Sequence, residues 1–133
     1  MKRKEAMAFI ARNHWAVMST FFPRGTPQLT PVVYALMGDK IRISCTRYRK
    51  KTKNLLRNPH AVLCIITPKF FGDYLTVEGR VSVVEDPDAT QNAALYEAIN
   101  GKPPDDLEEY LAERIRDQRL ILEMTIERLY PLE

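Results

Sequence analysis

The sequence contains little cysteine and histidine, the residues on which disulfide scaffolds and many metal sites depend. Its 133 residues include two cysteines, Cys45 and Cys64, which form no C-x-x-C pair and fall in apolar segments. We therefore expect two buried thiols and no disulfide scaffold. His14 and His60 have no motif partner at the spacing of metal ligands, so we expect no metal site.

Long apolar runs are absent as well. No stretch approaches the roughly 20 apolar residues that a membrane-spanning helix needs. Residues 1–15 lack the apolar core and small-residue cleavage site of a signal peptide. With 45% hydrophobic and 28% charged residues, the composition is that of an ordinary globular protein. We expect a single domain, residues 1–133, located in the cytoplasm and without membrane contact.

Acidic residues are scarce in the first half of the chain. Residues 1–66 hold 13 basic and 2 acidic residues, residues 67–133 hold 7 basic and 15 acidic residues, and the net charge is +3. Such asymmetry suits a nucleic-acid binder, a site for an anionic ligand, or a dimer whose unlike surfaces meet. Charge alone leaves these three open.

Apolar and polar residues alternate along several segments, which predicts strands with one buried face. Short turns join successive strands, and this favours antiparallel pairing. The expected strands cover residues 15–22, 27–36, 41–46, 61–67, 74–84 and 120–129, and the expected helices include residues 2–13, 89–100 and 105–116. The predicted fold class is mainly β with flanking helices, in which six strands form a small closed or partly closed barrel.

The basic segment 41–59 is central to our interpretation of the chain. A strand over residues 41–46 turns at Thr46 into a short helix that ends near Pro59. Six basic residues and no acidic residue lie between Thr46 and Arg57, counting Arg57 itself. A helix start offers unpaired backbone N–H groups and the positive end of the helix dipole to an anion. We interpret this segment as the phosphate cradle of a flavin-like cofactor.

Ordinary structural roles compete with this interpretation. Lys50, Lys53 and Arg57 have the spacing of one exposed helical stripe. Thr46 also suits a helix N-cap, a role worth roughly 1 kcal/mol. Pro31 lies within a strand pattern and cannot donate a ladder hydrogen bond, so it also suits a plain strand edge.

Several motifs follow one another in a specific order. A G-x-P-x-x-T-P-V strand is followed by a Thr-Arg turn, a lysine, an N-L pair and a proline, and later by YLTVEGRVSVVEDP and ERLYP. The positions of the first group are Gly25-Thr26-Pro27, Thr30-Pro31-Val32, Thr46-Arg47, Lys51, Asn54-Leu55 and Pro59. In this order they resemble the split β-barrel flavoproteins related to pyridoxamine 5′-phosphate oxidase, and within them the small deazaflavin-associated group. The likeness covers nearly the whole chain.

The resemblance implies a six-stranded antiparallel split β-barrel of the FMN-binding type. It also implies a homodimer with two cofactor sites at the subunit interface, where the central turn holds the phosphate and the preceding strand lies along the ring. The cofactor-binding residues that we predict are Gln28, Thr30, Pro31, Val32, Tyr34, Ser44, Thr46, Arg47, Lys50, Lys51 and Lys53.

Two cofactors fit these residues. FMN presents one phosphate, for which Thr46 and two cations suffice, whereas coenzyme F420 adds a tail of glutamates that suits the surplus of cations. We favour F420 over FMN and expect hydride transfer to or from a small, planar organic substrate. The family's pyridoxamine oxidases carry a basic residue near the position of Tyr34 and a C-terminal motif with Arg and His. This chain has neither, so we do not expect pyridoxamine phosphate oxidation.

Two other classes of function remain open. The run 47–51 places Tyr48 among cations, which suits a small barrel that binds single-stranded nucleic acid, although only one aromatic lies within that run. The same scaffold also suits a protein that stores a flavin or tetrapyrrole without catalysis. Trp15 and the loop pair Phe70-Phe71 are more often core or dimer contacts than ring-stacking residues. We assign no catalytic residue; solvent, Tyr34 and Arg47 are the candidate proton sources.

Overall fold

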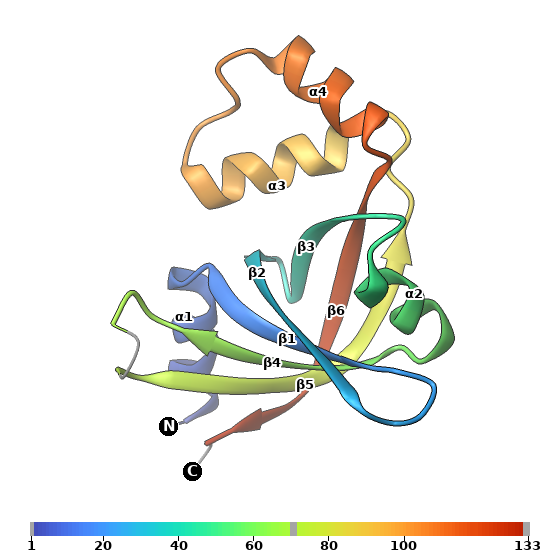
Figure 1. Ribbon diagram of the computed structural model, residues 1–133. Coiled ribbons are helices and arrows are strands. Elements are labelled where there is room, and N and C mark those ends of the chain that lie inside the picture. The colour runs from blue at the N-terminus through green and yellow to red at the C-terminus, as the bar shows by residue number, and fades with distance from the viewer. Residues whose placement is uncertain (1, 70–71, 132–133) are drawn as a thin grey trace.

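The computed structural model describes residues 2–69 and 72–131, which form a six-stranded barrel with four helices around it (Figure 1). In chain order the elements are α1 (Arg3–Arg12), β1 (Trp15–Phe21), β2 (Pro27–Met37), β3 (Lys40–Thr46), α2 (Lys50–Arg57), β4 (His60–Ile66), β5 (Tyr74–Val84), α3 (Thr90–Asn100), α4 (Leu107–Arg116) and β6 (Arg119–Tyr130). Phe70 and Phe71 lie outside the described residues. Within those residues, no helix has the length and apolar character needed to cross a bilayer.

The strands close into a barrel in the order β1-β2-β3-β6-β5-β4, and each neighbouring pair is antiparallel. Their ends agree with the predicted strands to within one residue. The predicted fold class, a six-stranded antiparallel split β-barrel with flanking helices, is therefore confirmed.

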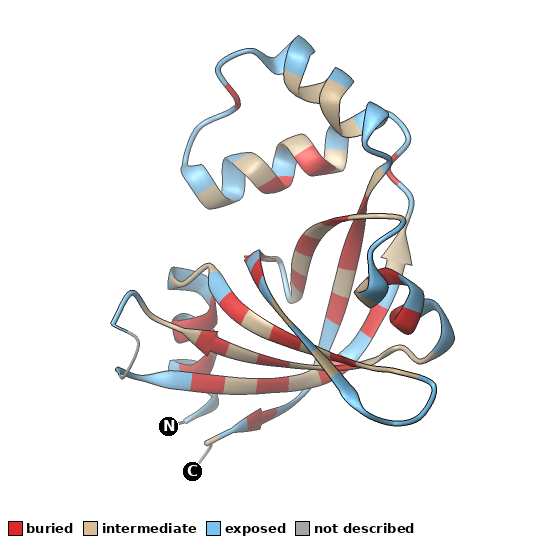
Figure 2. Ribbon diagram, in the orientation of Figure 1, coloured by how far each residue is buried: buried red, intermediate tan, exposed pale blue. Residues whose placement is uncertain are grey.

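The barrel interior is filled by every second side chain of the strands. In β3, for example, Ile41, Ile43 and Cys45 are buried and the residues between them are partly exposed, and Figure 2 shows this alternation along the other strands. Phe9 and Ile10 of α1 join the same hydrophobic cluster. Burial of these apolar side chains is the main source of the barrel's stability.

The pairing of β2 changes along its length. Residues 27–33 pair with β1, whereas pairing with β3 covers only Tyr34–Met37 against Lys40–Ile43. Beyond that point β3 continues along β6 as far as Thr46, and β2 and β3 diverge (Figure 1). The facing edges of the two strands therefore have no strand between them, and the barrel is split there.

The helix α2 begins later than the sequence suggests. Its N-cap is Arg49, with no side-chain capping bond, so the alternative role of Thr46 as an N-cap is wrong. Instead the backbone oxygen of Thr46 accepts a hydrogen bond from the hydroxyl of Thr52 at 2.8 Å. The amide of Asn54 donates to the Thr20 hydroxyl at 3.1 Å, and both side chains are buried. These bonds anchor α2 to the end of the barrel.

The helices α3 and α4 form a roof above the split (Figure 1). The carboxylate of Asp86 caps α3 by accepting backbone N–H bonds from its first turn, among them that of Asn92 at 2.8 Å. Leu95 of α3 packs with Ala35 and Ile121 in a second, smaller hydrophobic cluster. No residue of α4 is buried, so α4 is the outer layer of the roof.

The two thiols differ in their surroundings. Cys45 is buried in the barrel, as predicted, whereas Cys64 is only half-buried on the outer side of β4. Partial desolvation raises the pKa of the Cys64 thiol. The expectation that both thiols are buried is therefore wrong for Cys64, because its position in the strand alternation points it outward.

Gly79 is required where β5 crosses β6. The register shifts between Glu78, which pairs with Arg128, and Gly79, which pairs with Ile126, so a bulge lies in β6 opposite this point of β5. A Cβ atom on Gly79 would lie 1.9 Å from the backbone oxygen of Thr125, far inside van der Waals contact. Only glycine allows the two backbones to approach this closely.

We predict that Gly79→Ala destabilises the protein by at least about 2 kcal/mol, because the added methyl must push β6 away from β5. Urea unfolding followed by circular dichroism measures the change in unfolding free energy. Ser82→Ala, on the same strand at an exposed position, is the matched control and should change stability by less than about 0.5 kcal/mol. An equal effect of the two substitutions would contradict the assignment of a tight crossing at Gly79.

Candidate functional site

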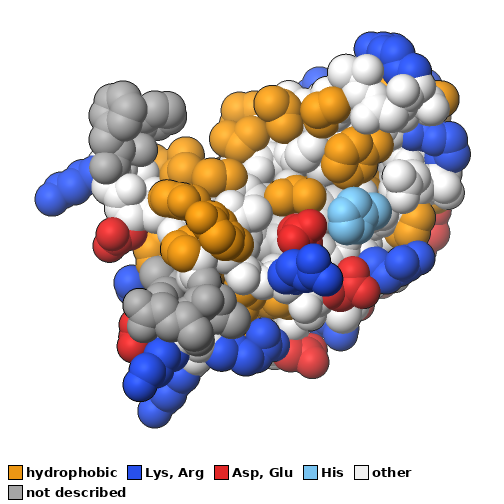
Figure 3. Space-filling model, turned by 90° about the horizontal axis from the view of Figure 1, so that it is seen from below, with side chains coloured by type: hydrophobic (Ala, Val, Ile, Leu, Met, Phe, Trp, Pro, Cys, Tyr) orange, Lys and Arg blue, Asp and Glu red, His pale blue; other side chains and the backbone are white. Residues whose placement is uncertain are grey.

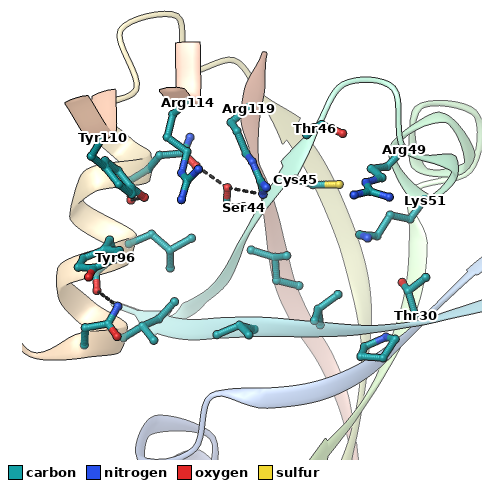
Figure 4. A pocket seen from close by; sticks show the side chains of 18 residues that line it. Thr30, Ser44, Cys45, Thr46, Arg49, Lys51, Tyr96, Tyr110, Arg114 and Arg119 are labelled. Carbon is teal, nitrogen blue, oxygen red and sulfur yellow. Dashed lines mark hydrogen bonds between the residues drawn. The ribbon is translucent and has the colours of Figure 1, made fainter. Parts of the chain in front are cut away.

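A cavity of about 580 Å³ lies at the split between β2 and β3. Residues Thr30–Val33 of β2 and Ile43–Thr46 of β3 line it, together with residues of α2, α3, α4 and the start of β6 (Figure 4). Its volume is in the range of small-molecule and cofactor sites, about 300–1,000 Å³. The unpaired edges of the barrel therefore border a space large enough for an organic ligand.

Four cationic side chains from the described part of the chain line this cavity. Arg49 and Lys51 come from the start of α2, Arg114 comes from α4, and Arg119 is the first residue of β6. None of the described residues that line the cavity is acidic. Such a donor set favours anionic ligands, because phosphates and carboxylates form charge-assisted hydrogen bonds with guanidinium and ammonium groups.

Two buried polar atoms at the cavity lack a partner. Among residues 2–69 and 72–131, the buried side-chain nitrogen and oxygen atoms without a hydrogen bond are Thr30 Oγ1 and Arg119 Nε, and both residues line this cavity. Buried polar groups are almost always hydrogen-bonded, since an unsatisfied one costs roughly 1–3 kcal/mol. Because both atoms lie at one cavity, we expect a ligand bound there to form the missing hydrogen bonds.

A polar network joins the roof to the barrel at the cavity wall. The amide nitrogen of Asn92 donates to Asp86 at 2.7 Å, and its amide oxygen accepts from the hydroxyl of Ser44. Ser44 in turn accepts a hydrogen bond from Arg119 Nη1 at 3.4 Å. Asn92 and Asp86 are both buried. The network therefore fixes Ser44 and Arg119 at the cavity through contacts with α3.

Two tyrosines form the wall beneath α4. Tyr96 and Tyr110 pack edge to face with ring centroids 5.2 Å apart, and the Tyr110 hydroxyl donates to the backbone oxygen of Asn92 at 3.2 Å. The guanidinium carbon of Arg114 lies 4.4 Å from the centre of the Tyr110 ring. The wall thus combines aromatic faces with a cation, next to the network around Asn92.

The structure brings a subset of the predicted cofactor-binding residues to this cavity. Those that line it are Thr30, Pro31, Val32, Ser44, Thr46 and Lys51. They come from three different elements, and the split of the barrel is what places them around one space.

The structure contradicts the prediction made for Tyr34. Its side chain is fully buried in the barrel, where its hydroxyl donates to the backbone oxygen of Ile10 at 2.8 Å. Burial raises the pKa of this phenol well above its usual range. The predictions that Tyr34 binds the cofactor and is a candidate proton source are therefore wrong, because it faces the core and holds its proton tightly.

The structure does not bring the other four predicted residues to the cavity. Arg47 forms an ion pair with Glu85 on the exterior, which lowers the pKa of the Glu85 carboxyl and raises that of Arg47. The Gln28 side chain accepts a hydrogen bond from Thr20 at 3.3 Å. Lys50 and Lys53 are exposed outside the cavity lining, as the alternative of a solvated helix face suggests.

Several lining residues escaped the prediction from sequence. Arg49 belongs to the basic run but was not among the predicted cofactor-binding residues. The others lie in the acidic half of the chain, where the charge pattern gave no signal: Asn92, Tyr96, Tyr110, Arg114 and Arg119. The D-P-D sequence at 86–88 lies just before α3, and its first residue, Asp86, supplies the carboxylate that caps this helix.

Solved structures with the same fold include several related proteins. An F420 reductase is 26% identical, covers 92% of this chain and 93% of its own, and superposes with a TM-score of 0.72. A conserved hypothetical protein of Mycobacterium tuberculosis is 21% identical with a TM-score of 0.80, covering 97% of this chain and 82% of its own. The heme storage protein HutZ of Vibrio cholerae is 14% identical with a TM-score of 0.71, covering 98% and 94%.

At 14% and 21% identity, the latter two likenesses concern the fold alone. Residues 3–133 match the sequence model of the pyridoxamine 5′-phosphate oxidase family. This range includes the six strands and the residues that line the cavity. The protein therefore belongs to the pyridoxamine 5′-phosphate oxidase family, which has flavin-binding and oxidoreductase members.

Proposed function

We propose that the protein is a cytoplasmic oxidoreductase that transfers a hydride between a flavin-type cofactor and a small planar organic substrate, with F420 favoured over FMN. The observation that carries the proposal is the cavity at the split, with four cations, no acidic residue among its described lining and two unsatisfied buried polar atoms. Membership of a family with oxidoreductase members and the likeness to an F420 reductase support it. The free thiol of Cys45 suits a reducing compartment.

The start of α2 would hold the cofactor phosphate. Lys51 and Arg49 present their cations to the cavity, and Thr46 adds a hydroxyl from the end of β3. The first turn of α2 also leaves backbone N–H groups without partners inside the helix. Such a set of donors suits a phosphate group, whose oxygens accept several charge-assisted bonds.

The free edge of β2 would lie along the cofactor ring. Between Thr30 and Val33 this strand pairs with β1 only, so its other edge faces the cavity. The Thr30 hydroxyl lacks a partner there, and Pro31 has no N–H to satisfy. A bound deazaflavin or flavin would supply the hydride chemistry, while Leu95 and Ile99 of α3 exclude water from the opposite side.

The cofactor choice follows from the number of cations. FMN needs only the cluster at the start of α2, whereas F420 carries additional carboxylates beyond its phosphate. Lys50 and Lys53 lie exposed on the same helix, where a glutamate tail leaving the cavity would pass. The F420 reductase among the solved structures, at 26% identity, also favours F420 over FMN.

A second copy of the chain would complete the site. A row of outward side chains crosses four strands, since Val33 pairs with Trp15, Trp15 with Ile66 and Ile66 with Tyr74. Trp15 is 51% exposed, and hydrophobic side chains gather on this side of the molecule (Figure 3). Such a patch is typical of a protein interface. Pro31 lies on the neighbouring row and also lines the cavity.

We predict that Lys51→Ala weakens cofactor binding by about tenfold or more, because one charge-assisted contact to the phosphate is lost, worth about 1.5–3 kcal/mol. Fluorescence titrations with FMN and with F420, side by side, measure the dissociation constants. Lys53→Ala, on the same helix but outside the cavity, should leave FMN affinity within about twofold. If Lys51→Ala binds both cofactors as the unmodified protein does, Lys51 has no part in the site.

The same titrations test the function itself. Micromolar binding of F420 or FMN, followed by reduction or oxidation of an added substrate, supports the oxidoreductase. Binding without turnover by any reductant or substrate would favour a storage protein. Salt-dependent binding of single-stranded DNA without cofactor binding would replace both with the nucleic-acid alternative.

We also predict that Trp15→Glu converts a dimer to a monomer, because a buried carboxylate at the centre of the apolar row is strongly unfavourable. Light scattering coupled to size-exclusion chromatography gives the mass of each variant. Leu107→Glu is the matched control: Leu107 is similarly exposed, at 47%, but lies on α4 away from that row. A dimer that survives Trp15→Glu would place the interface elsewhere.

A further inference from the structure

The cations of the cavity form two groups at different ends. Arg49 and Lys51 belong to the α2 end, whereas Arg114 and Arg119 extend from the roof side toward Ser44 (Figure 4). Both groups line one cavity, and β3 runs between them. A single phosphate at the start of α2 accounts for the first pair and leaves the second without a partner.

The second pair is held in place by the polar network described above. Arg119 donates to Ser44, Ser44 donates to Asn92, and Asn92 is anchored by the buried Asp86. Arg114 is fixed over the ring of Tyr110, whose hydroxyl binds the backbone of the same asparagine. The two guanidinium groups are therefore held by a hydrogen bond to a neutral hydroxyl and by a cation–π contact, and neither contact neutralises their charge.

One side of the Arg119 guanidinium group, the side of its Nε, forms no hydrogen bond with any described residue. Its Nη1 reaches Ser44, but its buried Nε has no hydrogen-bond partner. A carboxylate approaching that side could accept bonds from Nε and the neighbouring terminal nitrogen together, the bidentate geometry that suits arginine. Neither Arg114 nor Arg119 forms an ion pair among the described residues.

We propose that Arg114 and Arg119 form a second anion subsite, which binds the carboxylate of a planar aromatic substrate. Tyr96 and Tyr110 flank the subsite and provide aromatic faces for the ring of that substrate. The assignment of this anion to the substrate rests on the proposed function, which places the cofactor phosphate at α2 and the cofactor ring along β2.

The carboxylates of F420 are a less suitable source for this subsite. In F420 the glutamate tail continues from the phosphate, on the side away from the ring. With the phosphate at Lys51, the tail therefore leaves along α2, toward Lys50 and Lys53. Arg114 and Arg119 lie toward the roof, where a second molecule facing the ring would bind.

A matched pair of probes tests the subsite. 2-Naphthoate and 2-naphthamide have the same planar ring system, but only the first carries a charge. We expect calorimetric titration of the protein, with cofactor and without it, to give at least about tenfold tighter binding of 2-naphthoate, since a charge-assisted contact is stronger than a neutral one. Arg119→Gln and Arg114→Gln should each reduce this preference severalfold.

Two controls separate binding from folding. Arg116→Gln changes an exposed arginine of α4 that does not line the cavity, and it should retain the full preference for 2-naphthoate. Arg114 lies on a helix without buried residues, so Arg114→Gln should keep the unfolding midpoint of the unmodified protein. A preference that persists in both Arg114→Gln and Arg119→Gln, or that is missing from the unmodified protein, overturns the subsite.

The outcomes also separate this subsite from the proposed function. If neither F420 nor FMN binds but 2-naphthoate is still preferred through Arg119, the subsite stands and the cofactor proposal fails. If a cofactor binds and 2-naphthoate is not preferred, the subsite fails alone. If 2-naphthoate competes with F420 but not with FMN, the subsite holds the cofactor's tail, and its assignment to the substrate is overturned.

Discussion

The short contact between β2 and β3 is the constraint on which the rest of the structure depends. The two strands share only the pairs at the hairpin, Tyr34–Met37 with Lys40–Ile43, before they separate. A fully paired β2 and β3 would satisfy each other's backbone and leave no cavity. Because they separate, one edge of each strand needs another partner, and residues of α2, α3 and α4 gather around the gap instead.

The roof is held to this gap by polar contacts as well as by apolar ones. The hydrophobic cluster beneath α3 contains few buried residues, whereas Asp86 and Asn92 form a buried chain of hydrogen bonds that ends at Ser44 on β3. Hydrogen bonds are directional, so such a network fixes an orientation that loose apolar packing does not. That directionality accounts for the fixed positions of Arg119 and Ser44 at the cavity wall.

Much of the fold could be predicted from the sequence, because strand alternation is a local signal. The strands appear where apolar residues alternate, and the D-P-D sequence marks the start of α3. The prediction of individual side-chain directions was weaker. Tyr34 follows the same alternation as its neighbours, which places it inside the barrel rather than at the ring.

The cationic residues illustrate the same limit. The run at 47–53 was visible as charge, yet only Arg49 and Lys51 within it reach the cavity, because the helix turns its other cations toward solvent and Arg47 meets Glu85. Arg114 and Arg119 lie far along the chain among acidic residues. The return of β6 beside β3 brings Arg119 to the site, and the packing of α4 over the cavity brings Arg114; both are long-range contacts that no local pattern encodes.

The separation of the two hydrophobic clusters has a consequence for how the chain tolerates change. The barrel cluster includes α1 and the strand interiors, whereas α4 contributes no buried residue to either cluster. Substitutions on α4 can therefore reshape one wall of the cavity at little expense in folding free energy. In such an architecture the ligand specificity of the cavity and the stability of the barrel vary almost independently. Substitutions on α4 can then lead to binding of a new ligand while the barrel stays folded.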